Sequence, residues 1–356
     1  MKIDKQFINM IIVSLLLLLS VTSCAQPKVP QEKDMAAYML VYFTDPTHSL
    51  FMALSTDGYT FTDVNEGQPV IAGDTIASQK GIRDPHITRG PDGAFYMVMT
   101  DLHIFAKQHG YRKTTWERPA EDYDWGNNRG FVLMKSFDLI NWSRSNFLFD
   151  VGFDSFDDIG CAWAPQVIYD QEEDKMMVYF TMRMGHGLTK LYYAYADDDF
   201  TKLITQPKSL FEYPDENIQI LDADITQMPD GRYCMMYVAQ ESPGGIKMAF
   251  SDYINRDYKY APEWIDKEKG ACEAPNVWKR INSDKYVLMY DVFSVQPHNF
   301  GFVETTDFVN FENLGHYNEG VMKTNNFTSP KHGAVIQLTK DEALNLAKHY
   351  NTKLNI

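Results

Sequence analysis

The sequence predicts an all-β fold, a five-bladed β-propeller whose first blade is completed by a C-terminal strand. Two observations predict it. Short segments rich in Tyr, Phe, Val and Met alternate with Gly, Asp, Asn and Pro turns along most of the chain. These segments also recur as one repeated unit, and a sheet unit repeated around an axis brings its equivalent positions together at one mouth.

The first half of the repeat is a strand that opens with a short motif. It occurs four times, at Arg83 to Ile87, Trp163 to Val167, Leu221 to Ile225 and Glu273 to Val277. In two of these copies the strand runs into a Pro-Asp-Gly turn, and Asp84 and Asp222 each lie nine residues before the glycine of that turn. We therefore place Asp84, Asp222 and Glu273 at equivalent strand starts.

The second half of the repeat is a strand, a tight polar turn and an outer strand led by an aromatic residue. It occurs five times, beginning at Leu50, Phe131, Leu191, Ile246 and Gly301. With five second halves and four first halves, the unit Tyr38 to Ile71 lacks an inner strand, and Lys331 to Leu338 is the spare one. Closing the ring leaves no open sheet edge. The alternative is an open multi-sheet fold, but the matching counts favour closure.

Helical periodicity occurs near the C-terminus, at Asp341 to Tyr350, with Thr339 as the expected N-cap and acidic residues in the first turn. The longest insertion, Asp101 to Gly130, interrupts the second blade. Long ordered loops are often functional, so we expect this one to form a wall of the site. The alternative is a loop that packs on its own aromatic side chains.

The first 23 residues resemble an export signal. Lys2 and Lys5 form its basic region, and Ile11 to Leu19 form an apolar stretch too short to span a bilayer. Val21-Thr22-Ser23-Cys24 resembles a bacterial lipobox, which implies cleavage before Cys24 and lipidation of that residue. The alternative is an ordinary secretory signal with a chance cysteine.

On this interpretation residues 1–23 are a signal peptide, 24–34 a tether and 35–356 a catalytic propeller. We expect a lipid anchor to hold the protein in the bacterial cell envelope. The tether is not strongly acidic, which favours the periplasmic side over the cell surface.

Charge and cysteine content exclude several classes of partner and site. The formal net charge of −15 argues against nucleic acid as a partner but not against a neutral carbohydrate. Three cysteines follow Cys24, and their odd number and spacing fit neither a disulfide framework nor a zinc site. We expect Cys161, Cys234 and Cys272 to be buried thiols.

Three carboxylates that converge at one mouth suit acid–base cleavage of a glycosidic bond. Taken singly, each has a plain structural explanation: Asp84 as an Asp-Pro turn, Asp222 as a turn carboxylate and Glu273 as a surface charge. Their combination within one repeat favours a catalytic role.

The motifs Arg83-Asp84-Pro85, Trp163-Ala164-Pro165, Asp222 before its Pro-Asp-Gly turn, and Glu273-Ala274-Pro275, in this order, resemble glycoside hydrolase family 43. The resemblance covers nearly the whole mature chain. It implies that Asp84 is the general base, that Asp222 tunes and positions the acid, and that Glu273 is the general acid. Ala223 stands where the third motif usually has proline, which leaves Asp224 as an alternative to Asp222. The alternation of side chains along a strand favours Asp222.

The resemblance further implies an inverting exo-α-L-arabinofuranosidase that acts on plant polysaccharide or oligosaccharide side chains. A β-xylosidase, a galactosidase and a non-catalytic glycan-binding propeller are the alternatives. No cofactor is required, and a structural calcium ion in the central channel, near His332, is left open.

Six further residues are candidates for binding substrate, because aromatic faces stack on sugar rings and Arg or His side chains bind hydroxyl groups. They are Arg83, Trp163, His332, Trp125, Arg129 and His186. Arg183 and His186 are expected to cap the pocket from the third blade. Arg83 pairing with a neighbouring carboxylate, and His332 as an ordinary strand histidine, are the structural alternatives.

Overall fold

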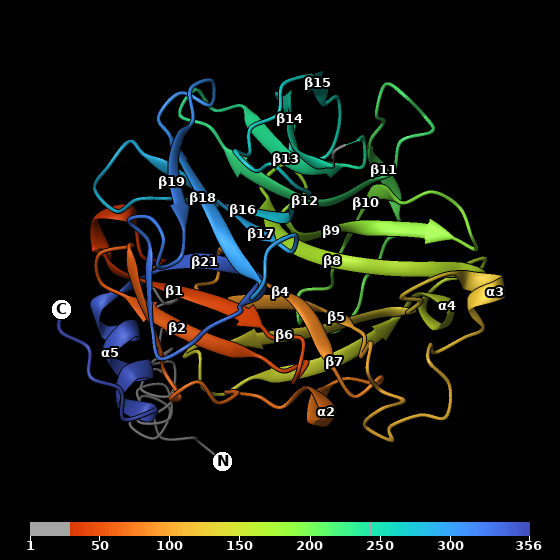
Figure 1. The fold of residues 1–356 in the computed structure, drawn as a ribbon, viewed down its shortest axis with the longest axis horizontal. Helices are drawn as coiled ribbons and strands as arrows, with labels where there is room; N and C mark the ends of the chain where they lie inside the picture. The colour runs from red at the N-terminus through yellow and green to blue at the C-terminus, as the bar shows by residue number, and fades with distance from the viewer. Residues whose placement is uncertain (1–28, 243) are drawn as a thin grey trace, which may run out of the picture.

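The computed structural model describes residues 29–242 and 244–356, so the predicted signal peptide, Cys24 and the first part of the tether lie outside the described residues. Within these ranges the chain forms five sheets, each made mainly of antiparallel strands, arranged as the blades of a propeller (Figure 1). The predicted fold class is therefore confirmed.

Four blades are continuous in sequence and consist of four strands each. The second blade contains β4 (Ile82–Arg89), β5 (Phe95–Asp101), β6 (Gly130–Ser136) and β7 (Ser143–Leu148). The third contains β8 (Ile159–Asp170), β9 (Lys175–Met184), β10 (Lys190–Tyr195) and β11 (Lys208–Phe211). The fourth contains β12 (Ile220–Gln227), β13 (Tyr233–Ala239), β14 (Gly245–Ser251) and β15 (Lys259–Ala261). The fifth contains β16 (Glu273–Lys279), β17 (Tyr286–Val292), β18 (Asn299–Thr305) and β19 (Glu312–His316).

The first blade joins the two ends of the described chain. Its strands are β1 (Met35–Phe43), β2 (Phe51–Ser55), β3 (Thr60–Asp63), β20 (Lys323–Asn325) and β21 (Lys331–Thr339), in the order β20-β3-β2-β1-β21. The pairing of β21 with β1 is antiparallel and confirms that the C-terminal strand closes the ring. The outer strand β20, which pairs in parallel with β3, was not predicted.

Helical elements are short except for the last one. They are η1 (Glu32–Asp34), α2 (Gly73–Ile76), α3 (Ala120–Tyr123), α4 (Phe149–Gly152) and α5 (Lys340–His349). As predicted, Thr339 caps α5, accepting a hydrogen bond from the Glu342 backbone while the Glu342 side chain bonds back to the cap. None of the described helices is long and apolar enough to cross a membrane.

The hydrophobic core lies between neighbouring blades and is divided into five clusters. The cluster between the first two blades also takes Ala343 and Leu346 from α5, and Arg89 on β4 makes an ion pair with Glu342 at 2.7 Å. The helix is thus fixed to two blades. Cys161, Cys234 and Cys272 are buried and unbridged, as expected.

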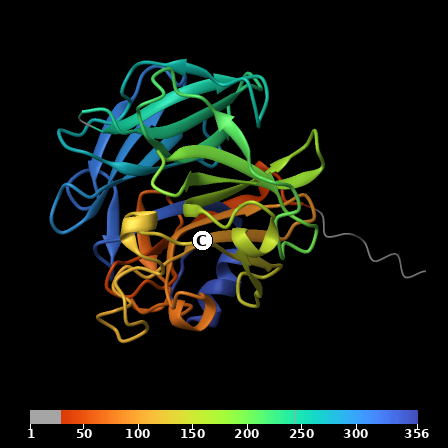
Figure 2. The same cartoon turned by 90° about the vertical axis from the view of Figure 1, so that its right-hand side faces the viewer.

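The insertion between β5 and β6, coloured orange to yellow, projects from the second blade beside β8 and carries α3 (Figures 1 and 2). Arg183 on β9 donates hydrogen bonds to the carbonyl oxygens of Tyr123 at 2.9 Å and Trp125 at 2.6 Å. These contacts fix the end of the insertion against the third blade, next to the inner strands.

Candidate active site

A β-bulge near the start of each inner strand shapes the site. In β4, β8, β12 and β16 the pairing with the second strand of the blade shifts after the first residue of the repeated motif. The next residue then has a left-handed backbone: φ is 52° at Asp84, 44° at Ala164, 51° at Asp222 and 59° at Ala274. A non-glycine residue in this region costs about 1–3 kcal/mol, and a bulge re-aims a side chain, so this strain is typical of a functional position.

The register corrects one prediction about equivalence. Asp84 and Asp222 occupy the bulge, and the matching shift in β21 places His332 there too. Glu273 lies one residue earlier, at the position that Arg83 and Trp163 occupy in their strands. Glu273 is therefore not strictly equivalent to the two aspartates, although it reaches the same space.

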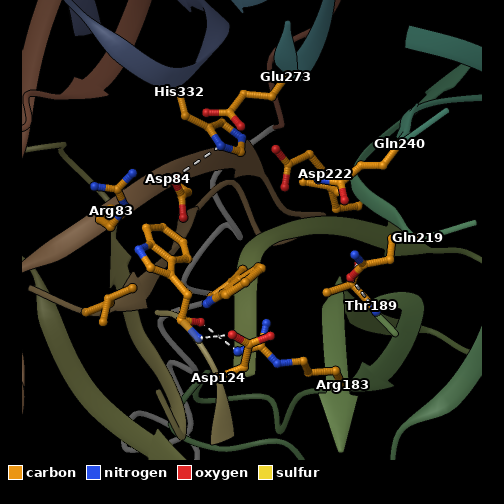
Figure 3. A pocket seen from close by; sticks show the side chains of 14 residues that line it. Arg83, Asp84, Asp124, Arg183, Thr189, Gln219, Asp222, Gln240, Glu273 and His332 are labelled. Atoms are coloured by element: carbon orange, nitrogen blue, oxygen red, sulfur yellow. Dashed lines mark hydrogen bonds and ion pairs between the residues drawn. The ribbon is translucent and has the colours of Figure 1, made fainter. Parts of the chain in front are cut away.

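Asp84, Asp222 and Glu273 line one cavity of about 300 Å³ at a mouth of the central channel (Figure 3). Four of the predicted binding residues, Arg83, Trp163, Trp125 and His332, line it as well. Arg183 does so too, as expected for a residue that caps the pocket. The lining that was not predicted consists of Leu102, Asp124, Thr189, Gln219, Leu221 and Gln240.

Asp84 is surrounded by groups that favour its ionised form. Thr100 donates a hydrogen bond to Asp84 Oδ2 at 2.7 Å, and His332 Nδ1 lies 3.2 Å from Asp84 Oδ1. Burial alone would raise the pKa of Asp84, but His332, Arg83 and Thr100 outweigh it and hold that pKa well below its usual range. The same contact also affects His332. Burial lowers the pKa of His332, but the negative charge of Asp84 outweighs burial and raises that pKa to about 9.

The surroundings of Asp222, in contrast, favour its protonated form. Burial, with the nearby charges of Glu273 and Asp84, raises the pKa of Asp222 to about 7 against the opposing effect of His332. Its Oδ2 accepts a hydrogen bond from the Ala274 backbone at 3.2 Å, which places it beside the strand that carries Glu273. At neutral pH this carboxyl retains a proton for much of the time.

The pKa of Glu273 is raised as well. Burial raises its pKa, Lys331 opposes this from 3.7 Å, and Asp291 supports it, with a net upward shift. Its side chain is still 30% exposed, so the carboxyl can reach a ligand in the cavity. Because Asp222 and Glu273 interact, the pair titrates together. The site thus combines one carboxyl whose pKa is lowered, Asp84, with two whose pKa values are raised, Asp222 and Glu273.

An aromatic wall faces the carboxyls. Trp163 donates its indole N–H to the Gly126 carbonyl at 2.9 Å, and the Arg183 guanidinium lies 4.7 Å from the centre of its ring. Trp125 meets Trp163 edge to face at 5.7 Å and is 51% exposed. The first ring is fixed and the second is available for stacking on a sugar.

Arg83 fits both of its predicted roles. Its guanidinium makes an ion pair with Asp45 at 3.0 Å and lies 4.7 Å from the centre of the Phe43 ring, while the residue also lines the cavity. Neither Asp45 nor Phe43 was named from the sequence, because both belong to the first blade and meet Arg83 only when the first two blades pack together.

The structure does not bring Arg129 or His186 into the cavity. Arg129 is held by two ion pairs, to Glu117 at 2.8 Å and Asp150 at 2.6 Å. His186 is exposed and contacts the Glu121 carbonyl oxygen. Both side chains stabilise the insertion and its neighbours, and their geometry lends no support to the predicted contact with substrate.

The channel below the carboxyls does not fit the calcium ion that was left open. Calcium takes six to eight oxygen ligands. The side chains at this level are His86, Gln166, Asp224 and Asn276. Both Asp224 oxygens already accept hydrogen bonds, from Asn276 at 3.2 Å and from the Val277 backbone at 2.9 Å. In residues 29–242 and 244–356, no group of three or more His, Cys, Asp or Glu residues could hold a metal.

Comparison with known proteins gives a family and a fold. The family model described as "Probable glycosyl hydrolase domain" matches residues 33–343. An alpha-L-arabinofuranosidase of Bifidobacterium longum subsp. longum is 28% identical over 130 residues. That match covers 36% of this chain but 11% of the relative, so the chain spans only a small part of that protein's length.

Solved structures are similar to the described fold at low sequence identity. A thermostable family-43 glycoside hydrolase aligns with a TM-score of 0.54 at 18% identity, over 75% of this chain and 83% of that one. A family-43 protein from Bacillus licheniformis aligns with a TM-score of 0.50 at 15% identity, over 86% and 52%. At these identities the likeness shows the fold alone.

Proposed function

Because the chain belongs to the glycosyl hydrolase family related to family 43, we propose that this glycosidase is an inverting exo-α-L-arabinofuranosidase acting on plant polysaccharide or oligosaccharide side chains. One observation carries the proposal. A single cavity holds an ionised carboxylate, Asp84, opposite two carboxyls whose pKa values are raised, Asp222 and Glu273. Acid–base cleavage of a glycosidic bond requires this asymmetry.

In this mechanism Asp84 is the general base. It takes a proton from a water molecule whose oxygen attacks the anomeric carbon from the face opposite the leaving group. Glu273 donates its proton to the glycosidic oxygen as the bond to the anomeric carbon breaks. Asp222 lies beside Glu273, and when it is ionised its negative charge favours the protonated form of Glu273.

The cavity supports exo cleavage of a terminal sugar. Its volume of about 300 Å³ lies at the small end of the range for ligand pockets, which suits one sugar unit. Trp125 offers a face for stacking, while Arg83 and His332 offer hydrogen-bond donors to hydroxyl groups. In this proposal a second sugar extends towards the open side of the cavity.

The arabinofuranosyl specificity has the support of the Bifidobacterium relative, whose name states that activity. A β-xylosidase or a galactosidase would use the same carboxyls with a different fit around the ring. A panel of aryl glycosides tests the choice, with the first-formed anomer of the product followed by NMR. We expect the fastest hydrolysis on α-L-arabinofuranosides, with inversion.

Two results of that panel would contradict the proposal. Hydrolysis with retention would exclude the roles given to Asp84 and Glu273, because retention requires a carboxylate nucleophile. Binding of glycans without hydrolysis of any aryl glycoside would favour the non-catalytic alternative.

We also propose that the protein is lipid-anchored through Cys24 in the bacterial cell envelope, on the periplasmic side. Val29 and Pro30, the first described residues, line a second cavity with Asp224 and Gln337, further along the same inner strands from the catalytic mouth. The described chain therefore begins at the other end of these inner strands from the catalytic mouth. Cys24→Ser should abolish lipid labelling and release a soluble, folded protein. Unchanged membrane fractionation of the variant would contradict the anchor.

A further inference from the structure

A buried ion pair lies directly behind Glu273. Lys331 Nζ is 2.9 Å from Asp291 Oδ2 and 3.7 Å from Glu273 Oε1. The side chains of Lys331 and Asp291 are 6% and 0% exposed. The ammonium therefore lies between two carboxyls, closer to the one that cannot reach the cavity.

The positions of these two residues in the repeat make the pair unusual. Lys331 occupies the place in β21 that Arg83 and Trp163 occupy in their strands, yet it is not among the residues that line the cavity. Asp291 on β17 pairs with Glu273, whereas the matching residues opposite Arg83 and Trp163 are neutral threonines. The blade that carries the proposed acid is thus the one with an extra buried charge.

Stability does not explain such a pair. Removing two charges from water is expensive, and a buried ion pair is often no better for folding than apolar side chains of the same size. One oxygen of Asp291 has no hydrogen-bond partner among the described residues, so this carboxylate depends on Lys331 and on the His332 backbone N–H at 3.4 Å. An arrangement this costly points to a role at the neighbouring carboxyl.

We propose that Lys331 is a positioning residue for Glu273, and that Asp291 holds its ammonium at the distance where it stabilises the Glu273 carboxylate only after proton transfer. The inference rests on the proposed role of Glu273 as the general acid. When the glycosidic bond breaks, the Glu273 proton moves to the departing oxygen and leaves a carboxylate beside Lys331. The ammonium at 3.7 Å stabilises that product of the step.

Asp291 prevents the same ammonium from acting too early. Without it, Lys331 could turn fully to Glu273 and hold that group as a carboxylate before substrate arrives, with no proton to donate. The shorter contact to Asp291 keeps the stronger attraction on the side away from the cavity. The two residues therefore act on Glu273 with opposite sign.

Glu273 faces further charged groups, and none of them is substituted in the test. Besides Lys331 and Asp291, they are His332 on β21, Asp222 on β12, and Arg83 and Asp84 on β4. Changing only Lys331 or Asp291 alters one charge of known sign next to the acid. A charge within about 4–6 Å typically moves a carboxyl pKa by about one unit or more.

The experiment compares Lys331→Met and Asp291→Asn. The Glu273 carboxyl is titrated by ¹³C NMR with labelled glutamate, and Glu273→Gln identifies its signal. Basic limbs of the pH–rate profile are measured on an α-L-arabinofuranoside. Lys331→Met should raise the Glu273 pKa and move the basic limb up by about one pH unit, and Asp291→Asn should move both down by a similar amount. Lys331→Arg should restore the native values.

Shifts in the same direction, or no shift in a folded variant, would overturn the proposal. Lys279→Met is the matched control, because Lys279 makes an ion pair with Glu32 away from the cavity and should leave the titration unchanged. Should Lys331→Met fail to fold, Lys331→Gln takes its place. The NMR titration needs no turnover, so a protein that hydrolyses no glycoside would contradict the proposed function without deciding this test.

Discussion

The central channel contains two layers of polar side chains. One layer joins neighbouring blades by hydrogen bonds, and the other faces the catalytic cavity. The upper layer comprises Asp84, Asp222 and His332 in the bulges, with Glu273 beside them. The lower layer comprises His86, Gln166, Asp224 and Asn276. Both layers come from the same inner strands, and the matching residues are two positions apart in sequence.

In the lower layer each side chain binds the next blade. The backbone N–H groups of Val167, Val277 and Val335 donate to His86 at 3.2 Å, Asp224 at 2.9 Å and Asn276 at 2.9 Å. Gln166 reaches the next blade through the Tyr179 hydroxyl, which accepts from the Ile225 backbone at 3.0 Å. These bonds repeat around the ring and satisfy buried groups.

The upper layer leaves its carboxyls facing a cavity. Asp222 and Asp224 show the contrast, since burial raises the pKa of each to about 7. Asp222 lines the cavity beside Glu273, whereas both oxygens of Asp224 accept hydrogen bonds from the next blade. A raised pKa alone therefore does not identify a catalytic group. The surroundings favour Asp222 over Asp224 as the residue that tunes the acid.

The largest effect is expected from a truncation that disrupts both layers at once. Truncation before Lys331 removes His332 from the upper layer and the Val335 backbone from the lower one, and it opens the ring. We expect loss of the cooperative thermal transition of the whole fold, measured by calorimetry, because β1 loses its paired strand and the fifth blade loses the neighbour that β16 packs against. A near-native transition would show that β21 is dispensable.

Asp84→Asn acts on the upper layer alone. It removes the base while keeping the shape of the side chain, so kcat should fall by about 10²–10⁴-fold. Glycan binding, measured by calorimetry, should change little. Loss of binding together with kcat would instead indicate that Asp84 mainly holds His332 and the cavity in place.

The smallest effect is expected from a matched pair of variants, Asp222→Asn and Asp224→Asn, which decides which of the two residues tunes the acid. Asp222→Asn removes a carboxyl whose ionised form repels the Glu273 carboxylate, so the Glu273 pKa should fall and the basic limb of the pH–rate profile should move down. Asp224→Asn should leave that limb in place but cost about 1–3 kcal/mol of stability, because an amide cannot accept from both of its donors. Reversed results would assign the tuning role to Asp224.

The raised pKa of Asp224 also leads to a prediction of how stability depends on pH. Its pKa in the folded state, about 7, lies above the value for an exposed aspartate, so the folded protein keeps a proton that the unfolded chain loses. This group therefore lowers the free energy of unfolding as pH rises from about 4 to 7. Denaturant titrations across that range should show a smaller decline in Asp224→Asn.

The sequence predicted the blades, the closing strand and the carboxyls, because strand periodicity and repeat spacing are local signals. It did not predict the left-handed backbone at Asp84 and Asp222, since bulges depend on pairing with another strand. Lys331 was recognised only as the start of a strand, because its contact with Asp291 requires the closed ring. Arg129 was assigned to the cavity because a loop sequence does not show which carboxylates will pair with it.

Glu273→Gln tests the central claim most directly. The variant cannot donate a proton, which a poor leaving group requires and an activated aryl leaving group hardly needs. The measurement is the loss of kcat/KM relative to the native enzyme on a natural arabino-oligosaccharide and on an activated aryl α-L-arabinofuranoside. We predict a loss of about 10²–10⁴-fold on the oligosaccharide and a much smaller one on the aryl glycoside. Equal losses on the two substrates would show that Glu273 is not the general acid.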